Sequence, residues 1–209
     1  MYTIKKANSR EELLALASDA ANRVEIKTNP WEATAPNASN PETWAVVAHS
    51  DDRFYVVMRS YETAIRTEIK EPWGMVHTDS CMEFFFSPCP DVRVNYFNME
   101  VSASGAMKLN YNERRGVNVS ADRDITKYGV DATITDSYWQ LVYEIPYAVI
   151  RDCAPEFEGK SGDIIKANFY KCGELAPYPH HLMWNPLDIN VFPKPDFHRP
   201  EGFVELTLA

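Results

Sequence analysis

Apolar and polar residues alternate along most of the chain after residue 43, with the period of two that is typical of half-buried β-strands. The runs are short, and small polar pairs such as Asp51-Asp52, Ser104-Gly105 and Asp136-Ser137 separate neighbouring runs as tight turns. The pattern predicts strands over Trp44–His49, Phe54–Tyr61, Ser80–Ser87, Val94–Ala103, Ala106–Tyr111, Val130–Thr135, Tyr138–Ile145, Ile164–Cys172 and Phe203–Leu208. Many short strands with tight turns indicate one all-β domain over residues 1–209, an antiparallel β-sandwich.

Helical signals are few. Ser9 and Glu12 have the spacing of a capping box, and leucines follow at helical positions, so a short N-terminal helix is predicted that ends before Asn22. A single helical turn is predicted over Pro146–Asp152, because proline fits the first position of a helix. The segment Asn29–Asn40 has the composition of a loop, which we expect to lie over the sandwich.

Successive side chains on a strand point to opposite faces, so the alternation also predicts which residues are buried. Trp44 and Trp139 lie on apolar phases of their strands and are interpreted as core residues. The residues expected together in one core are Phe84, Phe86, Phe97, Met99, Trp139, Leu141 and Phe169.

The opposite phase carries amide, carboxylate and guanidinium side chains in place of the Lys, Thr and Ser of an ordinary solvated sheet. Sugar hydroxyls are bound by planar side chains that form two hydrogen bonds, and the C–H face of a pyranose packs on aromatic rings. We therefore expect one concave, sugar-binding face that holds Arg59, Glu83, Asn98, Glu100, Gln140 and Asn168. The alternative is a charge-paired outer face in which Arg59 neutralises Glu83 or Glu100.

Two tryptophans lie in proline-flanked loop segments. Trp73 belongs to Glu-Pro-Trp-Gly and Trp184 to Leu-Met-Trp-Asn-Pro. Because the loops at the ends of a sandwich carry binding residues, these two indoles are predicted to flank one cleft and clamp a sugar ring. A buried structural role is the alternative for each of them.

The composition of the chain argues against some classes of binding partner. The chain has 209 residues, 45% of them hydrophobic, and a net charge of −9, which argues against a nucleic-acid-binding surface. No apolar run is long enough to span a membrane, and no signal-peptide pattern opens the chain. The expected compartment is therefore cytoplasmic, or extracellular if a signal has been removed.

Four cysteines, at positions 81, 89, 153 and 172, fit no zinc-binding spacing. We expect reduced thiols and no zinc, with a Cys81–Cys89 disulfide as the alternative if Pro88 turns the chain back.

Several motifs resemble the family 9-like carbohydrate-binding domains, relatives of the modules attached to xylanases. They follow one another in the family's order from about Trp44 to the C-terminus: Thr78-Asp-Ser-Cys-Met-Glu-Phe-Phe, Tyr96-Phe-Asn-Met-Glu-Val-Ser-Ala-Ser-Gly, Ala167-Asn-Phe-Tyr-Lys-Cys-Gly, His181-Leu-Met-Trp-Asn-Pro and Asp196-Phe-His-Arg-Pro-Glu-Gly-Phe.

The resemblance implies a β-sandwich that binds a glucose- or xylose-type sugar, as a mono- or oligosaccharide, without catalysis. It also implies the two-tryptophan clamp, for which Trp73 and Trp184 are the best matches, and an associated glycoside hydrolase as partner. Some such modules hold calcium, but the acidic residues Asp51, Asp52, Asp79 and Asp136 are too scattered along the sequence to assign a site. No cofactor is expected.

Three other functions are alternatives on the sequence. The same superfamily includes domains that bind haem through a Met and a His, and candidates for these ligands are Met75, His77, His180, His181 and Met183. A glycosidase is the enzymatic alternative, because Glu83, Glu100 and Glu144 share a predicted face and paired carboxyl groups catalyse glycoside hydrolysis. A purely structural interaction domain is favoured if the Asn29–Asn40 loop covers the aromatic face.

Overall fold

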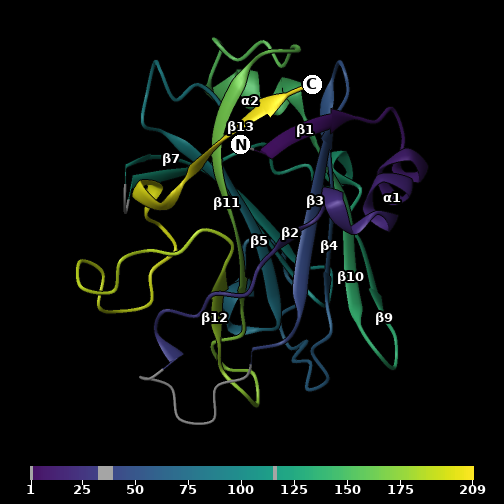
Figure 1. The fold of residues 1–209 in the computed structure, drawn as a ribbon, viewed down its shortest axis with the longest axis vertical. Helices are drawn as coiled ribbons and strands as arrows, with labels where there is room; N and C mark the ends of the chain where they lie inside the picture. Colours follow the sequence, from purple (N-terminus) through teal and green to yellow (C-terminus); the bar gives the residue numbers. More distant parts are fainter. Residues whose placement is uncertain (1, 33–39, 115–116) are drawn as a thin grey trace.

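Two layers of β-strands form the protein, with the core between them (Figure 1). The computed structural model describes residues 2–32, 40–114 and 117–209. Sheet A has the strand order β8-β7-β6-β5-β11-β13-β1, and sheet B has the order β1-β3-β4-β10-β9. The bounds of the strands in sheet A are β5 Cys81–Ser87, β6 Tyr96–Ser102, β7 Met107–Arg114, β8 Val117–Ser120, β11 Ile164–Cys172 and β13 Val204–Leu208. Those of sheet B are β3 Thr43–His49, β4 Arg53–Ser60, β9 Asp131–Ile134 and β10 Trp139–Pro146.

Strand β1, over Tyr2–Lys6, joins the two layers. Its first half pairs with β13 in sheet A, and Lys5 and Lys6 pair with β3 in sheet B. Both pairings are parallel, whereas the other ladders of the described residues are antiparallel. The predicted β-sandwich is confirmed. The prediction that its strands pair only in antiparallel fashion is wrong, because β1 pairs in parallel with β13 and with β3. The N- and C-termini consequently lie close together at one end of the molecule (Figure 1).

The main core fills the space between the sheets. All seven side chains predicted to share one core do so, and Phe84, Phe86 and Phe169 are fully buried there. Phe84 stacks on Phe86 and on Phe169, with ring centroids 4.9 and 4.7 Å apart, which joins β5 to β11 by side-chain packing as well as by the ladder. Alternation along each strand then directs the residues between these rings to the outer face of sheet A.

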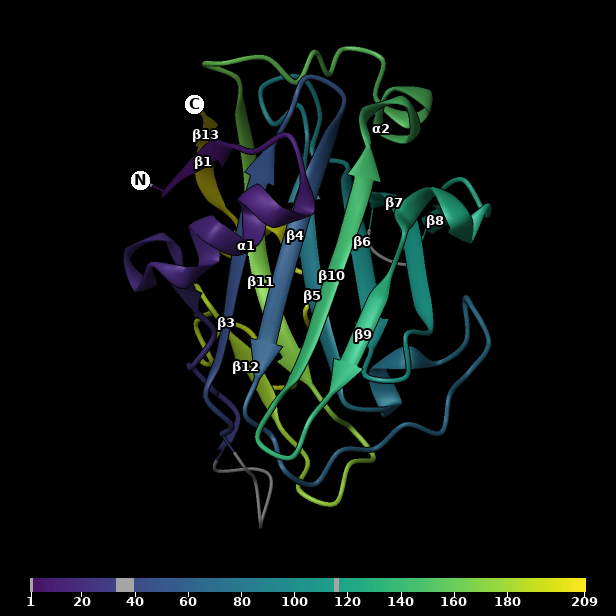
Figure 2. The same ribbon diagram turned by 90° about the vertical axis from the view of Figure 1, so that its right-hand side faces the viewer.

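The N-terminal helix α1, over Arg10–Ser18, covers the outer face of sheet B, where it lies across β3 and β4 (Figure 2). The predicted capping residue Ser9 accepts a hydrogen bond from the Glu12 amide at 3.2 Å. Glu12 in return accepts from the amide of Asn8 at 2.7 Å, one residue earlier than a standard capping box requires. Trp44 is buried beneath this helix, in a second apolar cluster outside the main core.

The outer face of sheet A is partly covered by irregular chain. The short strand β12, over His181–Met183, pairs with β11, and the residues between β12 and β13 follow as a long loop beside sheet A (Figure 1). Phe197 of this loop stacks on Tyr170 of β11 with centroids 4.3 Å apart. Trp31 packs against Phe197 and donates its indole N–H to the Phe192 carbonyl at 2.8 Å. Residues 33–39 of the predicted 29–40 loop lie outside the described residues.

The remaining short elements are β2 Val24–Glu25, α2 Tyr147–Cys153, and the 3-10 turns Ala20–Asn22, Val76–Thr78, Ile125–Tyr128 and Pro200–Gly202. Helix α2 is the predicted helical turn, shifted by one residue at each end. The four cysteines are free thiols, and Cys81 lies opposite Cys172 in the β5–β11 ladder, away from Cys89. Among the described residues, none of the helices has the length and hydropathy needed to cross a membrane.

Candidate functional site

A polar cavity of about 210 Å³ lies on the outer face of sheet A. Strands β5, β6, β7 and β11 form its floor, and the loop before β13 and the turn Val76–Thr78 form its walls. Four carboxyl groups, three histidines, a lysine, a thiol, a proline and a phenylalanine line it: His77, Glu83, Glu100, Lys108, Cys172, Glu174, His181, Pro195, Asp196, Phe197 and His198.

Glu100 on β6 is held in a single orientation by its neighbours. Its Oε1 atom accepts from the Asn98 side-chain amide at 2.6 Å, and its Oε2 atom lies 2.9 Å from Lys108 Nζ. Asn98 is itself fixed, because Asn112 Nδ2 donates to Asn98 Oδ1 at 2.5 Å. Burial opposes the charge on Lys108, but the attraction and hydrogen bond of Glu100 outweigh it, so the pKa of Lys108 is raised. Lys108 therefore keeps its charge, and its contact with Glu100 is preorganised at the cavity floor.

Glu83 on β5 lies directly opposite Glu100 in the ladder and is 2% exposed. Its Oε1 atom accepts a hydrogen bond from the Cys172 thiol at 3.1 Å. Burial raises the pKa of Glu83 well above its ordinary value, and negative charge on Cys172 and Glu100 adds to the effect. The raised pKa favours the protonated form of Glu83, in which a carboxyl group donates as well as accepts hydrogen bonds.

Glu174 stands at the rim between two histidines. Its carboxylate oxygens lie 3.7 Å from His181 Nε2 and 3.9 Å from His77 Nε2. The proximity of His181 lowers the pKa of Glu174 in spite of partial burial, and His77 lowers it further. The rim therefore carries a carboxylate with imidazole groups on both sides.

The opposite wall comes from the C-terminal loop. Phe197 is anchored on Tyr170, and the Tyr96 hydroxyl lies 2.9 Å from His198 Nδ1. Asp196 Oδ2 forms an ion pair with Arg199 Nε at 2.7 Å, which fixes the turn that carries Phe197 and His198. The cavity thus combines several carboxyl groups, among them Glu83 with its raised pKa, with an ammonium group and imidazoles. These are groups that donate to and accept from the hydroxyls of a small polyol.

Arg59 and Gln140 do not belong to this face, so the predicted single face is wrong for both residues. They are register partners on β4 and β10 of sheet B, and Arg59 Nη2 donates to Gln140 Oε1 at 2.6 Å. The Arg59 guanidinium also lies over the rings of Tyr138 and Trp44, at 4.0 and 5.2 Å from their centroids. Alternation shows which residues of one strand share a face. It does not show whether the outward residues of strands in two different sheets lie on the same side of the molecule.

The two predicted asparagines, Asn98 and Asn168, lie on the expected face of sheet A, and their side chains form hydrogen bonds within the protein. Asn98 orients Glu100, as described above. Asn168 is fully buried, and its amide donates to the carbonyls of Asn185 and Gly202 while its oxygen accepts from the Asn185 amide. Asn168 therefore ties the loop before β13 to the sheet, with its hydrogen-bonding atoms turned to the protein.

The two predicted clamp residues lie on either side of β5 and β6, so the prediction that they flank one cleft is wrong. Trp73 lies beside β7, where its backbone N–H donates to the Met107 carbonyl and its indole donates to Asn110 Oδ1 at 3.1 Å. Trp184 follows β12 on the inner side of β11, next to Phe169 and Tyr2. Trp184 lines a separate shallow hollow with Arg23 and Lys27. Register explains the difference, because Trp184 has the same phase as the core residue Leu182.

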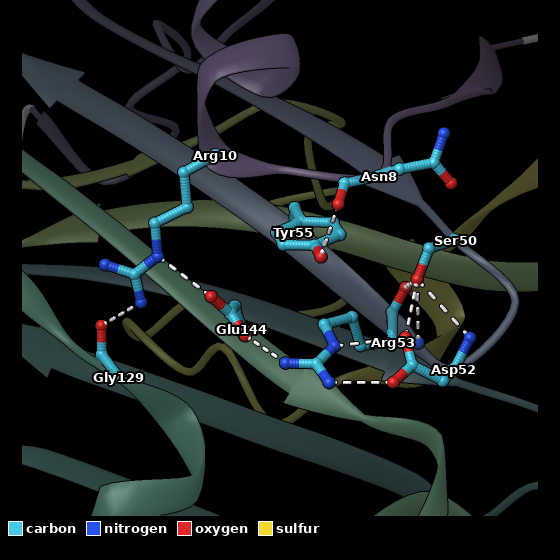
Figure 3. A network of polar contacts seen from close by, with 8 residues as sticks. All are labelled: Asn8, Arg10, Ser50, Asp52, Arg53, Tyr55, Gly129 and Glu144. Atoms are coloured by element: carbon cyan, nitrogen blue, oxygen red, sulfur yellow. Dashed lines mark hydrogen bonds and ion pairs between the residues drawn. The ribbon is translucent and has the colours of Figure 1, made fainter.

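Glu144, the third carboxylate of the glycosidase alternative, is far from Glu83 and Glu100. It lies on sheet B, between Arg10 Nε at 2.8 Å and Arg53 Nη1 at 2.5 Å, in a network that joins α1 to β4 and β10 (Figure 3). The hydrogen bonds and charges of both arginines outweigh partial burial and lower the pKa of Glu144. Its role is to fasten the helix to the sheet.

Two of the candidate haem ligands are held by internal hydrogen bonds. His180 lies with Nε2 2.5 Å from Lys171 Nζ and Nδ1 2.8 Å from the Tyr178 carbonyl oxygen, and Met183 Sδ accepts from the Leu187 amide at 3.2 Å. Met75 projects into solvent and is 60% exposed. His77 and His181 remain, and both belong to the polar cavity.

Lys108, Glu174 and the loop residues of the cavity were missed by the sequence reasoning. Lys108 shares the outward phase of the predicted strand Ala106–Tyr111 and lies opposite Glu100, a signal that cross-strand pairing would have revealed. Glu174 comes two residues after β11, and residues 195–198 are brought to the site by the loop. Their proximity depends on tertiary structure.

Comparison with known proteins identifies one family. The family model described as "Carbohydrate-binding family 9" matches residues 10–208. A protein from Bacteroides uniformis ATCC 8492 to which carbohydrate binding has been ascribed has a similar structure, with TM-score 0.84, 22% identity, and coverage of 99% of this chain and 98% of that chain.

Two solved structures of family 9 carbohydrate-binding modules from Caldicellulosiruptor kristjanssonii share the fold. The one in complex with cellotriose gives TM-score 0.64 and 10% identity over 99% of this chain and 92% of that chain. The one in complex with glucose gives TM-score 0.59 and 9% identity over 100% and 95%. None of the curated protein sequences matches the chain.

Proposed function

The chain belongs to carbohydrate-binding family 9, and we propose that its ligand is a glucose- or xylose-type pyranose bound in the polar cavity on sheet A. As a member of this family it is a non-catalytic carbohydrate-binding domain. The observation that carries the proposal is the convergence of Glu83, Glu100 and Lys108 at the floor of one cavity. Support for the sugar class comes from the structural relatives, which hold cellotriose and glucose.

The chemistry of the floor suits a ring with several hydroxyls. Each sugar hydroxyl donates one hydrogen bond and accepts others, so it needs an acceptor and a donor near each other. Glu100, fixed by Asn98 and Lys108, supplies the acceptor, and Lys108 supplies donors, to which Glu83 adds one in the protonated form that its raised pKa favours. Because their side chains are already oriented in the free protein, little side-chain entropy is lost when a ligand binds.

The size of the cavity favours a short ligand. Its volume of about 210 Å³ is below the roughly 300–1,000 Å³ of pockets that enclose drug-sized molecules. A single pyranose ring is the unit we expect inside, with any further ring of an oligosaccharide outside the walls. The edge of Phe197 supplies apolar surface beside the ring, in place of the clamp of two indoles.

Titration calorimetry with glucose, xylose, cellobiose and cellotriose tests the proposal. We expect saturable binding by the wild type, and a loss of about tenfold or more in affinity for Glu100→Gln, because a hydrogen bond to a charged group contributes about 1.5–3 kcal/mol. Gln140→Ala, on the outer face of sheet B, is the matched control and leaves the affinity unchanged. Equal affinities for wild type and Glu100→Gln, with both folded by circular dichroism, would rule out the cavity.

A glycoside hydrolase is the macromolecular partner that we propose, because a non-catalytic binding domain promotes hydrolysis by holding an enzyme on its substrate. Affinity capture with the tagged domain from its native cells, followed by assays on glucan and xylan, measures this directly. Enrichment of hydrolase activity is the expected outcome, and a captured fraction without it contradicts the partnership.

A further inference from the structure

Two thiols and a carboxyl group lie together at the floor of the cavity. The proposed sugar binding does not require either thiol. Cys81 on β5 is the ladder partner of Cys172 on β11, and Glu83 follows two residues after Cys81 on the same face. The Sγ atoms and a carboxylate oxygen of these residues all lie within 4.8 Å of one another. Cys172 Sγ is 3.1 Å from Glu83 Oε1, and the two thiols also contact each other.

This spacing is close to that of the ligands around a tetrahedral zinc ion. Zn–S bonds of about 2.3 Å and Zn–O bonds of about 2.0–2.2 Å place neighbouring donor atoms roughly 3.5–3.8 Å apart. The pairing of β5 with β11 holds the backbones of the two cysteines in place. We propose that Cys81, Glu83 and Cys172 bind a thiophilic divalent cation such as Zn²⁺, with a fourth coordination position open to the cavity.

The surroundings are suited to the charge of such a site. Two thiolates and a carboxylate carry three negative charges, of which a divalent cation neutralises two. Lys108 and Lys171, on the two sides of sheet A, are the cations that act on these groups. In the metal-free protein these lysines are bonded to other carboxylates, Lys108 to Glu100 and Lys171 to Glu62. No full positive charge therefore competes with the metal at the three donor atoms.

A metal ion can reach the three side chains, and the protons that it displaces can leave. Glu83 and Cys172 line the cavity, so an ion reaches them from solvent, whereas Cys81 is buried behind them. When Zn²⁺ enters, each thiol loses one proton and Glu83 loses the proton it holds, and these protons pass to solvent through the same opening. No oxidation or reduction takes place.

Cobalt(II) is the spectroscopic probe for this site, used on the reduced protein with no sugar present. The double variant Cys89→Ser, Cys153→Ser keeps Cys81 and Cys172 as its two thiols. We expect it to bind one Co²⁺ with a sulfur-to-cobalt charge-transfer band in the near-ultraviolet, and Zn²⁺ to displace the cobalt and abolish the band. A double variant that gives no such band overturns the proposal.

Single replacements identify the ligands. Cys172→Ser and Cys81→Ser are expected to abolish the charge-transfer band or weaken Co²⁺ binding by about 100-fold or more, since even loss of a second-sphere contact costs roughly 10–100-fold. A band of wild-type strength in either folded variant contradicts the assignment. If a serine variant does not fold, the double variant still decides the question. Sugar titration of Cys81→Ser, which retains Glu83 and Glu100, distinguishes failure of the metal site from failure of the sugar site.

Discussion

Glu83 and Glu100 face each other across the β5–β6 ladder, and their environments differ sharply. Glu100 is bonded to an ammonium group and an amide, whereas Glu83 lies against a thiol in a buried position. Like carboxyl groups directly opposite each other repel when both are ionised. The raised pKa of Glu83 favours its neutral form, which weakens this repulsion and adds a donor beside the acceptor Glu100.

Lys108 is expected to contribute to sugar affinity through Glu100 as well as by its own donors. Lys108→Met removes the ion pair at 2.9 Å and leaves a buried carboxylate without its counter-ion. We predict a loss of about tenfold or more in sugar affinity, measured by calorimetry. Lys166→Met, at the other end of the same sheet, is the control and retains wild-type affinity. Equal losses in both variants would indicate a general effect of charge.

A buried ion pair closes one end of the core and is predicted to stabilise the fold. Lys171 Nζ lies 3.0 Å from Glu62 Oε2, and both side chains are almost fully buried. Trp139 Nε1 and Ser80 Oγ also donate to this carboxylate. Lys171→Met is expected to lower the free energy of unfolding by about 3–5 kcal/mol in urea denaturation, because a buried charge loses its partner.

A second substitution checks the physical reason for that loss. Glu62→Gln in the Lys171→Met background removes the unpaired charge and keeps an oxygen for the Trp139 indole, while the Ser80 hydroxyl, which can accept as well as donate, faces the amide nitrogen. We expect this double variant to be more stable than Lys171→Met alone. A further loss of stability would mean that packing, and not the unpaired charge, dominates.

The stability of the protein is predicted to fall in mild acid because of His180. Burial, reinforced by the charge of Lys171, lowers the pKa of His180 from 6.5 to about 3. Between these values the unfolded chain binds one more proton than the folded chain, so the free energy of unfolding falls as the pH is lowered from about 6.5. The contribution of one proton approaches about 1.4 kcal/mol per pH unit.

His180→Gln isolates this contribution, since glutamine keeps an acceptor for Lys171 and does not titrate. Urea denaturation at several pH values between 4 and 7 is expected to show a steeper loss of stability for the wild type than for the variant. Parallel curves for the two proteins would show that His180 is not responsible.

The cap of α1 is a local and independent test of the fold. Ser9→Ala removes the hydrogen bond to the Glu12 amide and is expected to lower the free energy of unfolding by about 1 kcal/mol. Ser18→Ala, at the exposed C-terminal end of the same helix, is the control and changes stability by less than about 0.5 kcal/mol. A loss of similar size for both serines would contradict a specific capping effect.

The sequence predicted the strands better than the site. Period-two alternation placed Phe84 and Phe169 in the core and Glu83 and Glu100 on the outer face, because local backbone geometry determines side-chain direction. Strand β1 was missed, since its parallel pairings to β13 and β3 are made by residues distant in sequence. Arg59 was assigned to the wrong face for the same reason, because the packing of two sheets is not encoded in one strand.

The direction of a side chain in a loop could not be predicted from the sequence. Both Trp73 and Trp184 lie in loops, as expected, but a loop composition does not indicate the direction of a side chain. Pairing of β12 with β11 turns Trp184 toward Phe169, and a hydrogen bond to Asn110 keeps Trp73 beside β7. The loop that brings Phe197 to the cavity was predicted by neither composition nor period, since its position depends on contacts with Tyr170 and Trp31.

The location of the sugar can be determined in a crystal structure of the protein soaked with glucose. We expect one pyranose ring in the cavity on sheet A, within hydrogen-bonding distance of Glu83, Glu100 and Lys108. A ring stacked on Trp184 beside Tyr2, or bound to Arg59 and Gln140 on the outer face of sheet B, with the cavity empty, would contradict it.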